Sequence, residues 1–143
     1  MKDIDLAKAI LEKDKLALVI VKEEEVIFYS KEKGIKPIYM AVNTLKDQLV
    51  NSSVADRVIG KAAAMLCKYS NIKALHTKLI SESAMEVLEK ENIILTYDES
   101  APYIKNRDKT DLCPVEKLSS DIENTNLLLE KITDFLESIQ KKK

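Results

Sequence analysis

The densest group of chemically active side chains lies in the stretch YIKNRDKTDLCPVE, near the end of the chain. It brings together an amide, a guanidinium, a thiol and a carboxylate: Asn106, Arg107, Cys113 and Glu116. Pro114 suits the first position of a helix, which would make Cys113 the N-cap and Glu116 the third helical residue, close to a capping box. A thiol at a helix N-terminus is also favoured as a thiolate, which is the reactive form. Both interpretations, a capped helix start and a nucleophilic cysteine, remain open.

A second candidate is Asp56, in the segment SSVADRVIG. Ser53 and Asp56 have the spacing of a capping box, so Asp56 would help to begin a helix. An acid in the first turn of a buried helix can also point into a pocket and act as a general acid or base. Gly60 would then lie inside the helix, at a cost of about 1 kcal/mol, which indicates close packing there.

The remaining candidates have simpler interpretations. His76 lies in an expected strand with no partner at metal-ligand spacing, so we predict a structural role. Cys67 is expected to behave as a small hydrophobic residue, and Ser83 with Glu86 again fits a capping box. The sequence contains no Gly-rich phosphate loop, CxxC pair or GxSxG elbow, so we expect neither a metal nor a cofactor.

These residues must be positioned by an alternation of helices and strands. Apolar spacing predicts a short amphipathic helix over residues 4–13, and two β-rich runs at 16–22 and 25–30 predict a hairpin. Pro37 suits the first turn of a helix that continues to residue 50. Residues 51–70 then have a broad apolar face and only a narrow charged stripe, which predicts one long buried helix.

The pattern after residue 70 is typical of parallel βαβ units. A strand is expected at 72–80, a helix at 83–92 and a strand at 93–97. The sequence therefore predicts an α/β fold with a mixed sheet. The tail, from residue 121, has an apolar stripe at helical spacing. We expect this helix to dock on the sheet, the alternative being a dimer seam, for which two heptads are few.

Length and composition limit the functions that are open to the chain. At 143 residues it should form a single domain, and its 45% hydrophobic and 33% charged residues favour a soluble globular protein. Basic and acidic residues nearly cancel, 23 against 24, so nucleic acid binding is not indicated. The chain has no apolar run long enough for a membrane span and begins with acids rather than a signal peptide, so we expect a cytoplasmic protein with free thiols.

Three segments together resemble a small family of uncharacterised bacterial and archaeal proteins placed in the cytidine deaminase-like fold. They are ADRVIGKAAA, LISESAMEVLEKENI and PYIKNRDKTDLCPVE. The resemblance covers about residues 16–118 and leaves the C-terminal helix, about 119–140, outside the deaminase-like core. It implies a three-layer α/β/α sandwich whose pocket lies where the N-termini of the central helix and the next helix meet.

The resemblance also implies that the zinc site of true deaminases is missing. In those enzymes one helix carries His or Cys, any residue, then Glu, and the next begins with Pro-Cys-x-x-Cys. The corresponding triplet here is Val54, Ala55 and Asp56. An aspartate therefore takes the place of the glutamate, and a valine takes the place of the metal ligand. Ser81 and Ala84 stand where the two thiolates would be. Zinc-dependent deamination is therefore not expected.

Two functional hypotheses follow from the resemblance. In the first, the pocket binds a nucleoside-like or other small polar ligand, with or without zinc-independent chemistry at Cys113, for which Asp56 and Cys113 would be the catalytic residues. The ligand-binding residues would be Lys61, Ser81, Asn106, Arg107 and Glu116. In the second, the chain is a catalytically inactive interaction or scaffold domain that uses a sheet edge or the tail helix. A homo-oligomer is compatible with both hypotheses.

Overall fold

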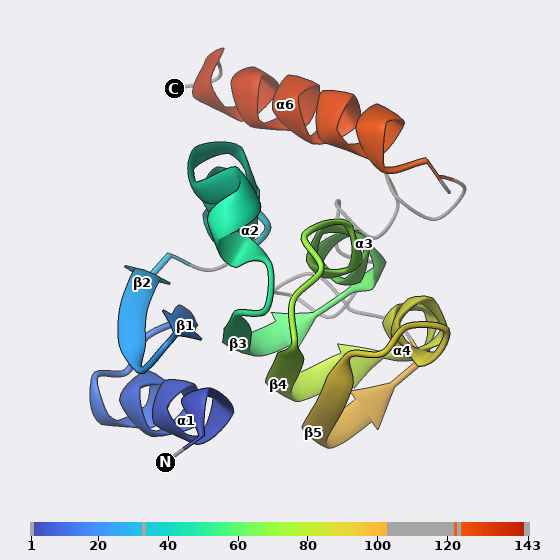
Figure 1. Ribbon diagram of the computed structural model, residues 1–143. Coiled ribbons are helices and arrows are strands. Elements are labelled where there is room, and N and C mark those ends of the chain that lie inside the picture. Colours follow the sequence, from blue (N-terminus) through green and yellow to red (C-terminus); the bar gives the residue numbers. More distant parts are fainter. Residues whose placement is uncertain (1, 33, 103–121, 123, 142–143) are drawn as a thin grey trace.

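The computed structural model describes residues 2–32, 34–102, 122 and 124–141. Within them the chain forms a five-stranded mixed sheet in the order β2-β1-β3-β4-β5, with helices on both faces (Figure 1). The α/β class expected from the sequence is confirmed. The elements are α1 (Asp3–Lys13), β1 (Leu18–Lys22), β2 (Glu25–Ser30), α2 (Lys36–Leu45), the 3-10 helix η1 (Lys46–Leu49), β3 (Ser53–Ile59), α3 (Lys61–Tyr69), β4 (Ala74–Ser81), α4 (Glu82–Glu89), β5 (Ile94–Ala101) and α6 (Thr125–Lys141).

The predicted hairpin is confirmed as β1 and β2. Glu23 and Glu24 form its turn with left-handed φ angles of 52° and 67°. The Asp3 carboxylate accepts hydrogen bonds from both of their backbone N–H groups, each at 3.0 Å. Along the ladder Ile20 pairs with Phe28 and Val21 with Val26, so Ile27 is an extra residue in β2 and forms a β-bulge.

The directions of the strands bring three helix starts to one side of the sheet. β1 runs antiparallel to both β2 and β3, whereas β3, β4 and β5 are parallel. β2 therefore runs in the same direction as β3, β4 and β5. We call the side where these strands end the carboxyl edge and the opposite side the amino edge. Because α2, α3 and α4 follow β2, β3 and β4 in the chain, all three helices begin at the carboxyl edge.

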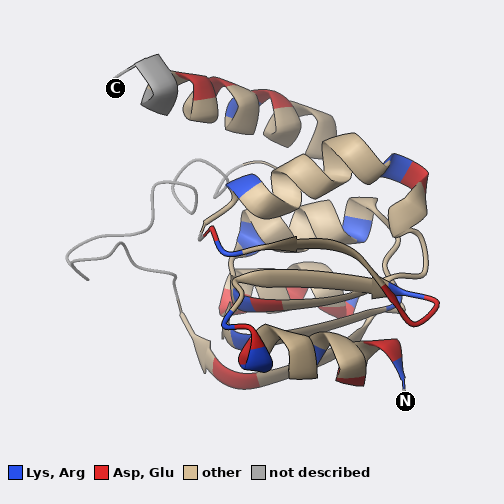
Figure 2. Ribbon diagram, turned by 90° about the vertical axis from the view of Figure 1, so that its left-hand side faces the viewer, with Lys and Arg blue, Asp and Glu red and all other residues tan. Residues whose placement is uncertain are grey.

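The described elements form layers on either side of the sheet (Figure 2). α1 packs on β1 and β3, where Ala7 and Leu11 meet Val19 and Ala55 in a small core. The larger core lies on the other face, between the sheet and α2, α3 and α4 (Figure 1). This arrangement agrees with the three-layer α/β/α expectation, to which α6 adds an outer helix.

The predicted long helix over residues 51–70 is wrong. Its first part is strand β3, and α3 begins only at Lys61. β3 lies between β1 and β4 with residues buried on both faces, so it lacks the alternation that marks a half-exposed strand. Gly60 is the N-cap of α3, with extended backbone, and does not lie inside a helix. The predicted capping box of Ser53 and Asp56 is therefore also wrong.

The start of α4 differs in a smaller way. Its N-cap is Ser81, whose Oγ accepts a hydrogen bond from the Ala84 N–H at 3.1 Å. The predicted capping box of Ser83 and Glu86 is wrong, because Ser83 lies inside the first turn and its Oγ is 3.1 Å from that of Ser81. The sequence had placed the helix start a little too late.

α6 docks on its own chain, on α2 and α3 rather than directly on the sheet (Figure 1). Leu128 and Ile132 are fully buried in the larger core. The hydroxyl of Tyr39 in α2 forms a hydrogen bond with that of Thr133. Of the helices in the described part of the chain, none combines the length and apolar character that crossing a membrane requires.

Candidate functional site

Lys61 and Ser81 stand at two neighbouring helix starts at the carboxyl edge. Lys61 is the first residue of α3 and Ser81 caps α4. The strands before them are parallel and paired, with Ile59 opposite Ile80, so the two helix starts are neighbours. Both residues are buried, with 8% of Lys61 and none of Ser81 exposed. The structure therefore places two of the residues predicted to bind a ligand at neighbouring helix starts.

Asp56 occupies a different position from the one predicted. It lies within β3, opposite Thr77 of β4, and not in the first turn of a helix. It precedes the end of β3 at Ile59 by three residues, which corresponds to roughly 10 Å along a strand. Val54, Ala55 and Asp56 therefore do not form the helical triplet that the resemblance implied.

The surroundings of the half-buried Asp56 raise the pKa of its carboxyl group. Its side chain alternates with that of Ala55, which faces α1, so it lies on the α3 side of the sheet. Burial raises the pKa of the Asp56 carboxyl to about 7. Hydrogen bonds to Oδ1 from the backbone N–H groups of Arg57 (2.6 Å) and Val58 (3.4 Å) oppose this shift only in part. Such a group can donate or accept a proton near pH 7.

Cys67 is fully buried on α3, as predicted for a small hydrophobic residue. Burial is the main cause that raises the pKa of its thiol, and the charge of Asp56 adds to the effect. A thiol with a raised pKa is a poor nucleophile. Cys67 is therefore not a candidate for chemistry.

The other predicted site residues lie outside the described residues. They are Asn106, Arg107, Cys113 and Glu116. β5 ends at Ala101, which pairs with Ser81, so the chain leaves the sheet at the carboxyl edge. The approach of these four residues to Lys61 and Ser81 stays a prediction.

His76 has partners that the sequence did not reveal. Its Nδ1 lies 2.8 Å from Thr96 Oγ1, and its Nε2 lies 4.0 Å from Asp98 Oδ1. Thr96 and Asp98 belong to β5, and only the pairing of β4 with β5 brings them beside His76. The one indication in the sequence was that Thr96 and Asp98 are two positions apart, which places their side chains on the same face of a strand. Burial, followed by the charge of Lys8, lowers the pKa of His76.

Metal binding has no support within the described residues. No group of three or more His, Cys, Asp or Glu side chains there could hold a metal ion. His76 and Asp98 supply only two ligand types close together. The hydrogen-bonded, buried His76 agrees with the structural role predicted for it.

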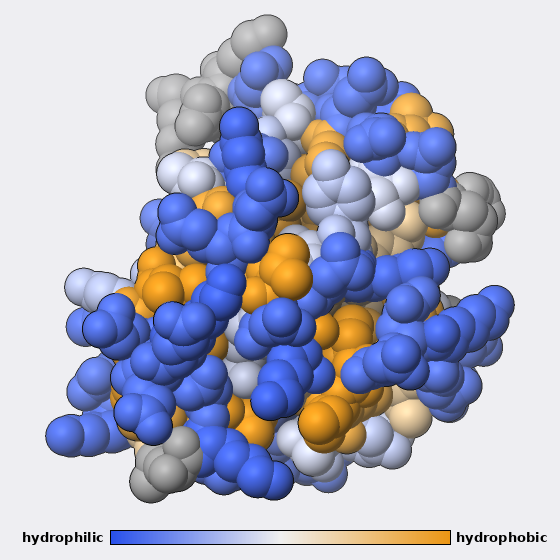
Figure 3. Space-filling view, viewed as in Figure 1, coloured by the Kyte–Doolittle hydropathy of each residue, from blue (hydrophilic) through white to orange (hydrophobic). Residues whose placement is uncertain are grey.

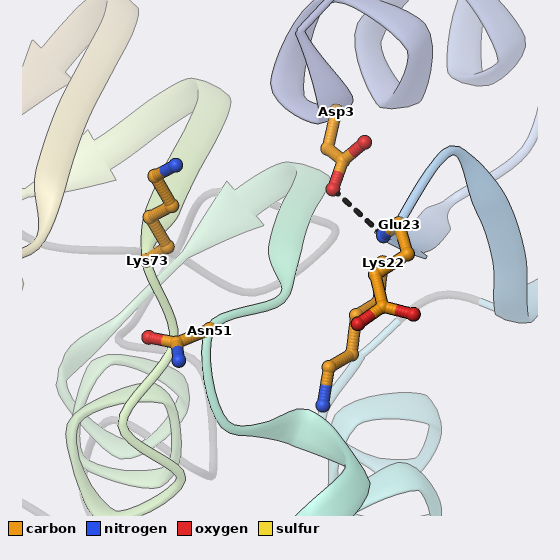
Figure 4. Close-up of a pocket in the computed structure, with 5 residues that line it drawn as sticks. All are labelled: Asp3, Lys22, Glu23, Asn51 and Lys73. Atoms are coloured by element: carbon orange, nitrogen blue, oxygen red, sulfur yellow. Dashed lines mark hydrogen bonds between the residues drawn. The ribbon is translucent and has the colours of Figure 1, made fainter.

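Neither of two open hollows in the described surface lies at the starts of α3 and α4. The first, of about 620 Å³, is at the amino edge and is lined by Asp3, Lys22, Glu23, Asn51 and Lys73. The side chains of Lys22 and Lys73 extend in different directions, and Asp3 is engaged by the Glu23 N–H (Figure 4). The charged groups do not converge on one point, so we interpret this hollow as a hydrated surface depression. The second, of about 550 Å³, lies beside β2.

Comparison with known proteins places the chain in a family. The model of the DUF1893 family (TM1506), a domain of unknown function, matches residues 6–136, so the chain belongs to this family. It is also similar to the crystal structure of a DUF1893 family protein (TM1506) from Thermotoga maritima, with 29% sequence identity and a TM-score of 0.84. That match covers 94% of this chain and 90% of the other. No curated protein matches the chain.

Proposed function

We propose that the carboxyl edge of the sheet, at the adjoining starts of α3 and α4, binds a small polar ligand of nucleoside type. The observation that carries the proposal is the pair of buried polar residues, Lys61 and Ser81, at these two helix starts. In open α/β sheets, ligands bind outside the carboxyl ends of the strands. The positive end of a helix dipole and a lysine both favour negatively polarised oxygen atoms on a ligand.

Asp56 is the described residue best suited to proton transfer in this proposal. A carboxyl group with a pKa of about 7 is matched to acid or base catalysis near neutral pH. Its position within β3 sets it back from Lys61 and Ser81, so a catalytic role requires part of the ligand to reach towards α3. If no part of the ligand extends that far, Asp56 affects only the stability of the protein.

We include in the proposal a distant likeness to cytidine deaminases without their zinc chemistry. The likeness implies a pocket where two helix starts meet. The starts of α3 and α4, which are neighbours at the carboxyl edge, support this part of the proposal. The first residues of α2, α3 and α4 read KPI, KAA and ESA, with no His or Cys among them. A zinc ion held as in true deaminases would find no protein ligand at these described positions.

Ligand-induced stabilisation of a metal-free sample tests the binding proposal. We expect a nucleoside, nucleotide or base to raise the melting temperature, since a ligand at 100 times its Kd adds about 2.7 kcal/mol to the free energy of unfolding. Lys61→Met should abolish the ligand-induced rise, whatever its effect on the unliganded protein. Lys73→Met, at the amino edge, is the matched control and should retain it. If no compound of these classes shifts the wild-type melting temperature, the proposal fails.

The proposed chemistry at Cys113 has its own test, the rate of thiol alkylation against pH. A reactive thiolate predicts a half-maximal rate well below the ~8.5 of a free cysteine. Cys67 is the internal control and should remain unlabelled in the native protein, because it is fully buried. A Cys113 that reacts with an ordinary pH dependence would remove the catalytic part of the proposal and leave binding intact.

A further inference from the structure

α1 is attached to the sheet through a small apolar contact. Ala7 and Leu11 are its only buried residues, and they meet Val19 and Ala55. The outer surface at the lower left of Figure 3, where Figure 1 shows α1, is mainly hydrophilic. An 11-residue helix is too short to be stable alone, so α1 stays helical only while it is docked. A polar group that holds the end of α1 therefore has a large effect on this helix.

Arg57 is such a group, and it lies beside a carboxyl group that competes for it. Its Nε donates a hydrogen bond to the Leu16 carbonyl (2.6 Å) and its Nη2 to the Leu11 carbonyl (3.2 Å). Asp56 pairs with Leu18 across the ladder, and Leu16 precedes Leu18 by two residues, or roughly 7 Å of extended chain. The guanidinium is thus close enough for its charge to act on the carboxyl group of Asp56.

The carboxyl group of Asp56 has one engaged oxygen atom and one without a partner. Oδ1 accepts hydrogen bonds from the backbone N–H groups of Arg57 and Val58. Oδ2 forms no hydrogen bond or ion pair with the residues that the structure describes. An ionised carboxylate that is largely desolvated and incompletely paired is unfavourable. A guanidinium is its best partner, because it binds a carboxylate more strongly than a neutral carbonyl.

The other described groups near the pair do not provide this partner. Cys67 lies near Asp56 on α3, and burial raises the pKa of its thiol, which therefore stays neutral. Glu12 of α1 lies near Arg57, and its hydrogen bond from Lys78 lowers its pKa, so it is ionised throughout the neutral range. The partners of Asp56 across the two ladders are uncharged: Leu18 and Thr77. Within the described part of the chain, Arg57 is the one cation that acts on Asp56.

We infer that Arg57 and Asp56 form a pH-sensitive switch, in which the guanidinium holds the end of α1 while Asp56 is neutral and moves to the carboxylate once Asp56 is ionised. The move breaks the bonds to the Leu11 and Leu16 carbonyls, so the end of α1 loosens. Because the pKa of Asp56 is about 7, the exchange falls near neutral pH, with α1 held below it and released above it. This inference does not depend on the proposed ligand site.

Hydrogen exchange of the Leu16 amide, measured by NMR in the full chain, tests the switch. This amide bonds to the Leu11 carbonyl at 3.0 Å, so it reports on the end of α1. Its protection factor, which is corrected for the intrinsic exchange rate, should fall roughly tenfold or more between about pH 5.5 and about pH 8.5. The Arg57 Nε–H signal should shift with the same midpoint as the carboxyl carbon of Asp56.

Three variants separate the switch from a general loss of stability. Asp56→Asn should keep Leu16 protected at both pH values, and Arg57→Met should leave it poorly protected at both. Asp134→Asn, at an exposed position on α6, is the control and should show the wild-type fall. Constant protection in the wild type would overturn the inference. So would a fall that persists in Asp56→Asn or that is as large in Arg57→Met, because the guanidinium would then not be its cause.

Discussion

Asp56 makes the stability of the protein depend on pH. Its carboxyl has a pKa of about 7 in the folded chain, raised mainly by burial from an ordinary value of 3.8. Between these two values the folded state retains a proton that the unfolded state has lost. Stability therefore falls as pH rises from about 4 to about 7, and this loss is complete above the folded pKa.

Asp56→Asn should remove this pH dependence. The amide has nearly the same shape and stays neutral, so the variant should match the wild type near pH 4 and exceed it at pH 8, by up to about 4 kcal/mol. Urea unfolding across this pH range gives the comparison. Asp134→Asn, at an exposed position on α6, is the control and should follow the wild-type profile. An Asp56→Asn profile parallel to that of the wild type would show that the carboxyl is not held neutral.

Arg57 connects α1 to the sheet through two side-chain hydrogen bonds. Its Nε donates a hydrogen bond to the Leu16 carbonyl at 2.6 Å and its Nη2 to the Leu11 carbonyl at 3.2 Å. Leu11 lies in the last turn of α1, where a positive charge is favourable, and its carbonyl also accepts a hydrogen bond from the Leu16 N–H at 3.0 Å. One side chain of β3 thus holds the end of α1 and the loop that follows it.

Arg57→Met should therefore destabilise the protein by about 2 kcal/mol, because it leaves two carbonyls without a charged donor. Arg57→Lys keeps the charge and loses the two-pronged geometry, so its loss should be smaller. The free energy of unfolding in urea measures both, with Lys73→Met as an exposed control. Equal stability of Arg57→Met and the wild type would mean that water replaces these bonds without cost.

The elements that the sequence predicted correctly are those with local signals. The β1–β2 hairpin has two β-rich runs around a tight polar turn, and α2 has Pro37 at its start. β3 was missed because it has buried residues on both faces, so it lacks the alternation of a half-exposed strand and continues directly into the apolar face of α3. Gly60 marked the boundary between them, and its low helix propensity was the available clue.

The candidate site could be predicted only in part, because the residues that surround it lie far apart in the sequence. The resemblance implied a pocket where the starts of two successive helices meet, and α3 and α4 do begin beside each other, although α3 begins at Lys61 and not near residue 51 as predicted. The setting of Asp56 depends on the register of β3 against its neighbours, which no local pattern specifies. The contact of His76 with Thr96 likewise joins residues 20 positions apart.

In the described fold as a whole, α6 is the helix that can separate from the rest with the least disturbance of the sheet. It packs on α2 and α3 and takes no part in the sheet. Its undocking exposes Leu128 and Ile132 but breaks no strand ladder. Native-state hydrogen exchange should therefore show the α6 amides opening at a lower free energy than those of β3 and β4. Equal protection of α6 and the central strands would show that the helix unfolds only with the sheet.

The fastening of α1 by Arg57 also has a consequence for the newly made chain. α1 is synthesised before β3, and the arginine that holds its end follows Leu11 by 46 residues. At about 5–20 residues per second, translation takes roughly 2–9 s to supply it. During that time an 11-residue helix, too short to be stable alone, has no β3 to cover its apolar face. The end of α1 therefore cannot be held by Arg57 until β3 has also been synthesised.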